Sequence, residues 1–95
     1  MQLGDNLRIR KFEFTLEGTT AKELNVYCGL FIINGGNNMI VVGACSANTS
    51  TVESIINSYS GGYGTFSMSK DVWGKLTVSK STSGTGNYTA YIFGY

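Results

Sequence analysis

Hydrophobic and polar residues alternate along most of the chain with a period of two, which indicates β-strands. In the first such stretch, over 7–17, the phase shifts once near Arg10 and Lys11, and this shift predicts a β-bulge. The apolar members of the stretch are Leu7, Ile9, Phe12, Phe14 and Leu16. The sequence therefore predicts that the chain begins with a half-buried strand.

Two apolar stretches, 24–33 and 39–47, flank the turn residues Asn34 to Asn38 and predict a β-hairpin. Both faces of this hairpin are apolar. We expect one face to carry Leu24, Val26, Leu30 and Ile32, and the other to carry Tyr27, Phe31, Ile33, Ile40 and Val42. A two-faced apolar ribbon is typical of a strand pair that is covered on both sides.

The segment 49–59 is ambiguous between helix and strand. Val52, Ile55, Ile56 and Tyr59 have the spacing of a short helix near 50–58, whereas the β-branched residues favour a strand. After a loop at 58–64, three further strands are expected at 65–70, 72–80 and 87–95, with a turn at 81–86 joining the last two. We therefore predict one all-β domain over 1–95, a small antiparallel β-sandwich or jelly-roll-like fold of six to seven strands.

Composition narrows the function. The 95 residues carry a net charge of +1 and no histidine, and only 14% of them are charged. This balance argues against nucleic acid as a partner, and the short apolar runs argue against membrane insertion. Without histidine, and with two cysteines, we expect no metal, no cofactor and no catalytic residues. The six carboxylates are scattered, which is typical of solvated charges, so no enzymatic activity is expected.

Charge is also distributed unevenly. From residue 24 to 69 Glu53 is the only Asp, Glu, Lys or Arg, and 81–95 contains none. A chain of this size buries only about 60–65% of its unfolded surface, so a monomer needs more charge than this on its exterior. The neutral faces are therefore expected to meet other copies of the chain, which predicts a homo-oligomer.

Cys28 and Cys45 lie on the two arms of the predicted hairpin and on the same face. A cross-strand disulfide and a pair of buried free thiols both fit this placement. Directly paired strand cysteines strain the disulfide geometry, which favours free thiols.

Aromatic residues crowd the C-terminal part of the chain beside Asn, Ser and Thr. Flat rings next to amides and hydroxyls are typical of sugar recognition, because the rings cover the apolar face of a pyranose. The candidate ligand-binding residues are Tyr59, Tyr63, Trp73, Asn87 and Tyr88. The same rings could instead fill a small core or an oligomer interface, and this alternative is open for each of them.

Three features of the chain carry a family resemblance: a charge-poor composition rich in Gly, Ser, Thr and Asn, the hairpin at Asn34 to Asn38, and the strand–turn–strand ending from Trp73 to Tyr95. In these features the chain resembles the small C-terminal β-domains of phage tail-fibre, baseplate and other virion appendage proteins. The resemblance implies a homotrimer on a virion or extracellular surface that binds a glycan or protein receptor without catalysis. No fibrous shaft or heptad run precedes the strands, as it usually does in such proteins.

Two functions follow as hypotheses. The first is a non-enzymatic structural or adhesion module, with its binding surface on the loop of Tyr59, Gly61, Gly62 and Tyr63 and on the turn 81–87. The alternative is a monomeric carbohydrate-binding module with an exposed aromatic platform.

Overall fold

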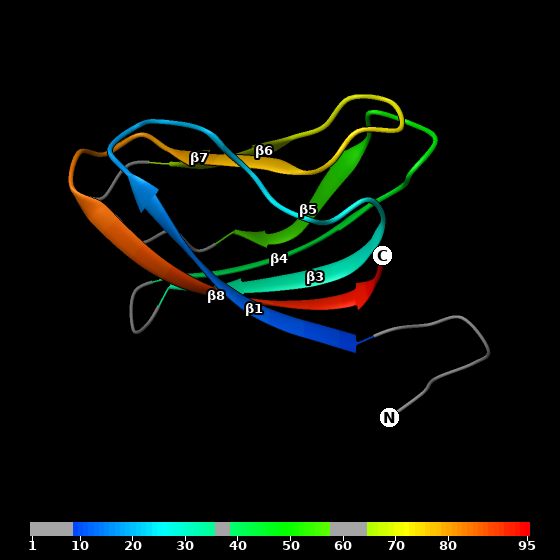
Figure 1. Ribbon diagram of the computed structural model, residues 1–95, viewed down its shortest axis with the longest axis horizontal. Coiled ribbons are helices and arrows are strands. Elements are labelled where there is room, and N and C mark those ends of the chain that lie inside the picture. Colours follow the sequence, from blue (N-terminus) through cyan, green and yellow to red (C-terminus); the bar gives the residue numbers. More distant parts are fainter. Residues whose placement is uncertain (1–8, 36–38, 58–64) are drawn as a thin grey trace.

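The computed structural model describes residues 9–35, 39–57 and 65–95, which form two antiparallel sheets packed face to face (Figure 1). The larger sheet has five strands in the order β1-β8-β3-β4-β5, and the smaller has three in the order β2-β7-β6. The strands are β1 (Ile9–Glu17), β2 (Lys22–Glu23), β3 (Gly29–Asn34), β4 (Ile40–Cys45), β5 (Val52–Asn57), β6 (Phe66–Ser69), β7 (Thr77–Lys80) and β8 (Thr85–Gly94). Within these ranges no residue is helical, so the predicted all-β sandwich is confirmed. The two-residue β2 is a strand that the sequence pattern did not predict.

The core lies between the two sheets and is made by every second residue of the strands and by residues of the segments next to them. The largest fully buried side chains are Phe31, Leu16, Ile33, Leu76, Ile92, Val26, Val41 and Val78. Burying an aliphatic or aromatic side chain of this size contributes about 1.5–3 kcal/mol. At one end of the core Tyr88 stacks on Phe14, with 5.3 Å between the ring centroids, and contacts Phe66 at 5.9 Å.

The predicted hairpin exists, but its first arm is divided between the sheets. Leu24 donates its N–H to the carbonyl of Leu76 at 2.8 Å, so the chain before β3 lies along the smaller sheet. It enters the larger sheet at Gly29, whose φ of 119° and contact with β8 suit only glycine. The single strand expected over 24–33 is therefore wrong in its first half.

The two apolar faces of the hairpin are confirmed, with a corrected register. Ile32 pairs with Val42, and Asn34 pairs with Ile40, so five positions separate the paired ends of the strands. This register differs by one residue from the register of a four-residue loop, and a shift of one residue moves each side chain of a strand to the other face. Ile40 and Val42 therefore lie on the outer face with Ile32, and not on the inner face with Phe31.

The predicted bulge near Arg10 is absent, since β1 pairs with β8 in continuous register from Ile9 to Glu17. Ile9 lies on the outer face, and Arg10 takes the inner position at the end of the sandwich. The bulge lies instead between β4 and β5, where Ile55 has no partner in the register. This bulge interrupts the period of two, which gives the apolar residues of the segment an apparent helical spacing. The short helix predicted near 50–58 is therefore wrong, because Val52–Asn57 is a strand.

The stretch 72–80 is a strand only in its second half. β7 begins at Thr77, and the residues before it form the loop between β6 and β7. The predicted loop at 58–64 lies outside the described residues.

Candidate functional site

The loop between β6 and β7 presents Trp73, which is 70% exposed. The φ of Trp73 is 62°, in the left-handed region that a residue with a side chain rarely adopts. Its N–H donates to the carbonyl of Ala47 at 2.8 Å, and the N–H of Gly74 donates to that of Asp71 at 2.9 Å. Such a conformation costs about 1–3 kcal/mol and persists only where surrounding contacts impose it. The loop therefore holds the indole ring outward.

Lys70 is the main contact that fixes this loop. Its side chain is 6% exposed, and its Nζ donates to the carbonyls of Thr49 at 2.8 Å, Asp71 at 2.9 Å and Ala47 at 3.4 Å. A buried ammonium is costly unless its donors are satisfied, and here backbone carbonyls satisfy all three. Lys70 thus ties the loop after β4 to the loop that carries Trp73.

Lys80 has the same role in the turn before β8. Its buried Nζ donates to the carbonyls of Thr82 at 2.7 Å, Gly84 at 2.8 Å and Ser83 at 3.4 Å. The turn predicted to bind a ligand is therefore a braced loop whose carbonyls point toward a lysine.

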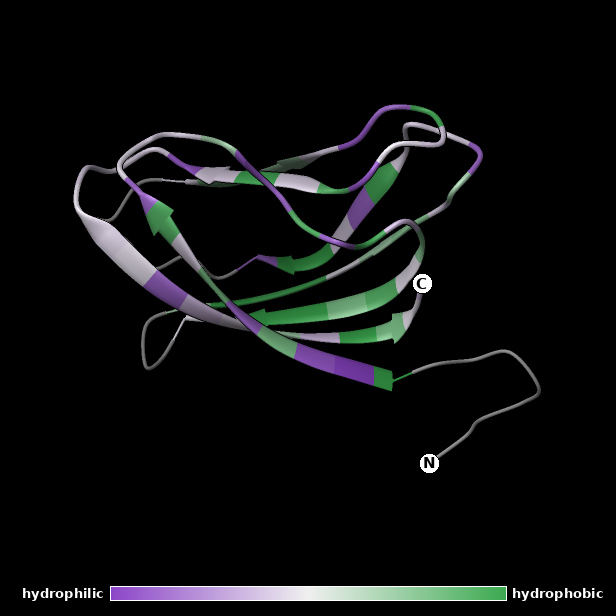
Figure 2. Ribbon diagram, viewed as in Figure 1, coloured by the Kyte–Doolittle hydropathy of each residue, from purple (hydrophilic) through white to green (hydrophobic). Residues whose placement is uncertain are grey.

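The outer face of the five-stranded sheet has two adjacent apolar rows. Across the strands, one row holds Ile9, Phe93, Leu30 and Ala44, and the next holds Tyr91, Ile32, Val42 and Ile56. Figure 2 shows the same hydrophobic character along β3, β4 and the end of β8. Ile9, Leu30, Tyr91 and Ile56 are exposed, and no described strand covers this face (Figure 1). We call these eight residues the outer apolar face.

The other half of the same sheet surface is polar. Here the Thr15 hydroxyl and the Asn87 side-chain oxygen are joined by a 3.0 Å hydrogen bond, in which the hydroxyl is the donor. Glu13 and Thr89 complete the polar part of a shallow groove of about 290 Å³. The polar rows thus adjoin the outer apolar face without a break in the sheet.

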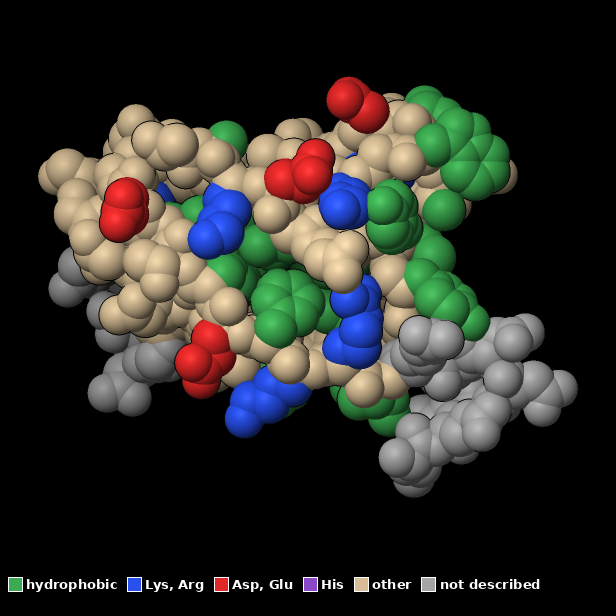
Figure 3. Space-filling model, viewed as in Figure 1, with side chains coloured by type: hydrophobic (Ala, Val, Ile, Leu, Met, Phe, Trp, Pro, Cys, Tyr) green, Lys and Arg blue, Asp and Glu red, His purple; other side chains and the backbone are tan. Residues whose placement is uncertain are grey.

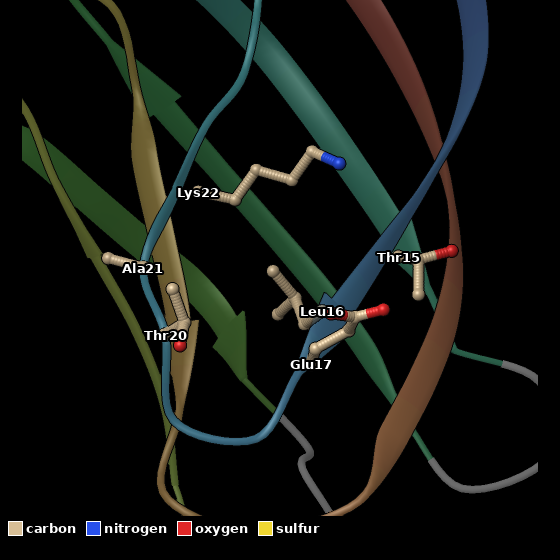
Figure 4. Close-up of a pocket in the computed structure, with 6 residues that line it drawn as sticks. All are labelled: Thr15, Leu16, Glu17, Thr20, Ala21 and Lys22. Atoms are coloured by element: carbon tan, nitrogen blue, oxygen red, sulfur yellow. The ribbon is translucent and has the colours of Figure 1, made fainter.

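A wider cleft of about 380 Å³ opens between β1 and the chain that leads into β2 (Figure 4). Leu16 points into it from β1 and Lys22 reaches across from the opposite wall, whereas the polar groups of Thr15 and Glu17 are directed away from Lys22. It contains one carboxylate, one amine and hydroxyl groups, but no aromatic ring.

A smaller pocket of about 150 Å³ lies at the end of the sandwich and is lined by Arg10, Asn25, Tyr27 and Tyr95. The Arg10 Nη2 atom is buried and has no hydrogen-bond partner among the described residues. Lys75 places its Nζ 5.6 Å from the centroid of the Tyr27 ring, on the side of the smaller sheet.

Both cysteines are free thiols and both are half-buried, so the preference for free thiols is confirmed while full burial is not. Burial raises the pKa of the Cys45 thiol, partly opposed by the nearby Lys70 ammonium. Cys45 also donates to the carbonyl of Tyr27 at 3.8 Å. A neutral, hydrogen-bonded thiol is a poor nucleophile.

The structure places the five predicted ligand-binding residues in different surroundings. Tyr59 and Tyr63 lie outside the described residues. Trp73 is exposed at the β6–β7 loop, whereas Asn87 lies on the outer face near the start of β8, at the opposite end of the molecule (Figure 1). Tyr88 is 6% exposed, and its ring packs in the core. The described residues therefore do not form one joint site.

Sequence reasoning missed the buried cations Lys70 and Lys80 and the half-buried Arg10. A signal was present for the two lysines, because each continues the inward phase of its strand, Lys70 after Phe66 and Met68. Arg10 gave no such signal, because the bulge predicted near Arg10 left the face of the strand on which it lies undefined.

Among the described residues, no group of three or more His, Cys, Asp or Glu side chains could hold a metal ion. The same residues contain no helix long and apolar enough to cross a membrane. Comparison of the chain with protein-family models, curated proteins and solved structures yields no match.

Proposed function

We propose that the protein is a non-enzymatic structural and adhesion module that assembles into a homotrimer through its outer apolar face and contacts a surface receptor, as in a virion appendage. The observation that carries this proposal is the pair of adjacent apolar rows on the five-stranded sheet, with Ile32 and Val42 at their centre. Contiguous apolar patches of this kind mark association sites in proteins.

The area of the sheet is sufficient for a second copy. With about 4.8 Å between strands and about 6.8 Å between residues on one face, the outward positions of the five strands cover about 600 Å². Packed face to face, two copies bury about 1,200 Å², the lower limit of specific, stable interfaces, whereas in a ring of three copies each contact uses half of each face and buries about 600 Å², or about 1,800 Å² over the three contacts. The polar rows beside the outer apolar face supply the hydrogen-bonding rim that such interfaces carry.

Charge favours another copy of this chain as the occupant. On this face Lys11 lies on the edge strand β1, and Glu53 lies on the opposite edge strand β5. If the β1 side of each copy packs on the β5 side of the next, the cation of one copy lies near the anion of its neighbour. A ring of three copies repeats this contact and closes without leaving an apolar edge.

Receptor contact is assigned to the Trp73 loop, which lies on the smaller sheet, away from the outer apolar face (Figure 1). An exposed tryptophan in a braced loop provides a large contact area at little entropic cost, which is typical of binding anchors. Assembly and adhesion thus use opposite sides of the sandwich.

The test is the solution mass by light scattering after size exclusion, for the wild type, Ile32→Lys and Ser67→Lys. A trimer of the 10.2 kDa chain has three times that mass. Ile32→Lys places a charge at the centre of the outer apolar face and should give monomers. Ser67→Lys changes an exposed residue of β6 on the smaller sheet and should remain trimeric.

A wild-type mass twice that of the chain would replace the ring by a two-fold pair. A monomer at all concentrations would overturn the assembly proposal. Circular dichroism of each variant shows whether the fold is retained.

A monomeric carbohydrate-binding module is the second candidate, and the 70% exposure of Trp73 favours it. Retention on polysaccharide columns tests it with Trp73→Ala and with Val72→Ala, its exposed neighbour. Loss of retention for Trp73→Ala alone, in a protein that is monomeric throughout, would support this second function.

A further inference from the structure

The guanidinium of Arg10 lies at the end of the sandwich, in a pocket that Arg10 lines together with Asn25, Tyr27 and Tyr95. Arg10 occupies an inner position of β1, opposite the buried Ile92, and is half-buried. Its Nη2 is buried without an acceptor among the described residues. Leaving a buried charged donor unpaired is unfavourable, which makes the pocket selective for a ligand that supplies the acceptor.

The walls of the pocket are rigid. The Tyr95 carbonyl accepts hydrogen bonds from the N–H of Tyr27 at 2.6 Å and of Cys28 at 2.8 Å, and the N–H of Tyr95 donates to the Cys28 carbonyl at 2.9 Å. These backbone bonds hold the two tyrosines next to each other. Both tyrosines are exposed, and both line the pocket.

A second cation lies beside the pocket. It is Lys75, whose Nζ lies 5.6 Å from the Tyr27 ring centroid. Figure 3 shows Lys and Arg side chains on this face of the molecule, with hydrophobic side chains between them and with Asp and Glu side chains on the same face. None of the four side chains that line the pocket is acidic.

We infer that this pocket binds the carboxylate of an acidic sugar. A guanidinium binds a carboxylate through two parallel hydrogen bonds, and tyrosine rings beside it cover the apolar face of a pyranose. The Asn25 amide offers a donor and an acceptor for ring hydroxyls. At about 150 Å³ the pocket is smaller than a typical ligand cavity and suits one charged sugar residue at the end of a glycan.

This inference rests on the proposed adhesion function in one respect only, namely that the sugar would belong to the surface receptor. The pocket is separate from the outer apolar face. Trimer formation and sugar binding are measured independently, so one can fail without the other. If the mass is that of a trimer and no acidic sugar binds, the proposed assembly stands and the pocket inference falls.

The experiment is an NMR titration of the full chain with D-glucuronate and with D-glucose, which differ by the carboxylate in place of a hydroxymethyl group. Glucuronate should shift the Nε–H signal of Arg10 and the amide signals of Tyr27 and Tyr95, with a millimolar dissociation constant. Glucose should bind at least about tenfold more weakly, as expected for the loss of a charged hydrogen-bonded pair.

Two variants and two further ligands complete the test. Arg10→Met should weaken glucuronate binding about tenfold or more, and Lys22→Met, which changes an exposed lysine remote from the pocket, should have no effect. If Arg10→Met fails to fold, the Arg10 Nε–H shift in the wild type still decides the question. Equal binding of glucose, equal binding of acetate, tighter binding of N-acetyl-glutamate amide, or no shift of the Arg10 signal would each overturn the assignment to an acidic sugar.

Discussion

Replacing Lys70 by methionine should destabilise the protein and release the loop that carries Trp73. Methionine keeps the apolar part of the lysine stem but removes the ammonium group. That group donates to Thr49 at 2.8 Å and to Asp71 at 2.9 Å, with a longer contact to Ala47 at 3.4 Å. The substitution therefore removes the hydrogen bonds between the two loops while leaving the packing of the stem in place.

The magnitude follows from the two shorter bonds. A hydrogen bond from a charged donor contributes about 1.5–3 kcal/mol, so the pair contributes about 3–6 kcal/mol. The carbonyls belong to surface loops, where water can replace the lost donor, so we expect the lower end, about 3 kcal/mol. For a chain of this length that loss lowers Tm by about 12–24 °C. It is a large part of a total stability of about 5–15 kcal/mol, yet the variant should still fold.

The assay combines urea unfolding followed by circular dichroism with fluorescence anisotropy of Trp73, the single tryptophan of the chain. Lys70→Met should lower the midpoint of unfolding and, in the absence of urea, lower the anisotropy of Trp73. Lys22→Met is the matched control, because Lys22 is exposed on β2 and should change stability by less than about 0.5 kcal/mol. If Lys70→Met changes stability no more than this control, the carbonyl contacts of Lys70 do not stabilise the fold and our reasoning is refuted.

Two further predictions concern a strand junction and a thiol. Gly29→Ala should lower the free energy of unfolding by about 2 kcal/mol or more, because φ of Gly29 is 119° and a Cβ would lie 2.5 Å from the Phe93 carbonyl oxygen. Gly84→Ala should cost only about 1 kcal/mol, because φ of Gly84 is 89° but a Cβ there would have no atom within 4 Å. Urea unfolding measures both losses, and equal losses would contradict the role of the Phe93 contact. Burial raises the pKa of the Cys45 thiol, so the folded protein binds this proton more tightly than the unfolded chain does. The contribution of the protonated thiol to the free energy of unfolding is therefore complete below the unfolded pKa of about 8.5 and is lost as pH rises through the folded pKa. The stability of the wild type relative to Cys45→Ala should therefore be constant below the unfolded pKa of the thiol and fall as pH rises above it, and a difference that does not depend on pH would contradict burial as the cause.

Much of the secondary structure could be predicted because strand pairing in a sandwich leaves a period-two record in the sequence. The alternation at Phe12, Phe14 and Leu16 identified the first strand and its buried face, and both are present in the structure. The prediction failed where one residue changes the phase. The bulge at Ile55 resembled a helical spacing, and the turn at Trp73 interrupted a stretch that alternated like a strand.

The candidate sites were less predictable, because a binding surface depends on which strands become neighbours. Sequence alone identified Trp73 as a candidate but also Tyr88, whose ring is stacked on Phe14 in the core. It could not associate Arg10 with Tyr27 and Tyr95, since these residues are distant in the chain and meet only where the end of β8 reaches the segment before β3.

By itself the sequence determined the class of fold, the apolar character of both faces of β3 and β4, and the scarcity of charge that points to association. These properties depend on local alternation and on composition, and both are read directly from the amino-acid sequence. Tertiary structure alone decided that Leu30 and Ile32 share an outer surface with Phe93 and Tyr91, and that Lys70 and Lys80 are buried against carbonyls. Those arrangements depend on the strand order β1-β8-β3-β4-β5, in which the last strand inserts between the first and the third. Register between strands so far apart in the chain is set by packing of the whole core, which no local pattern encodes.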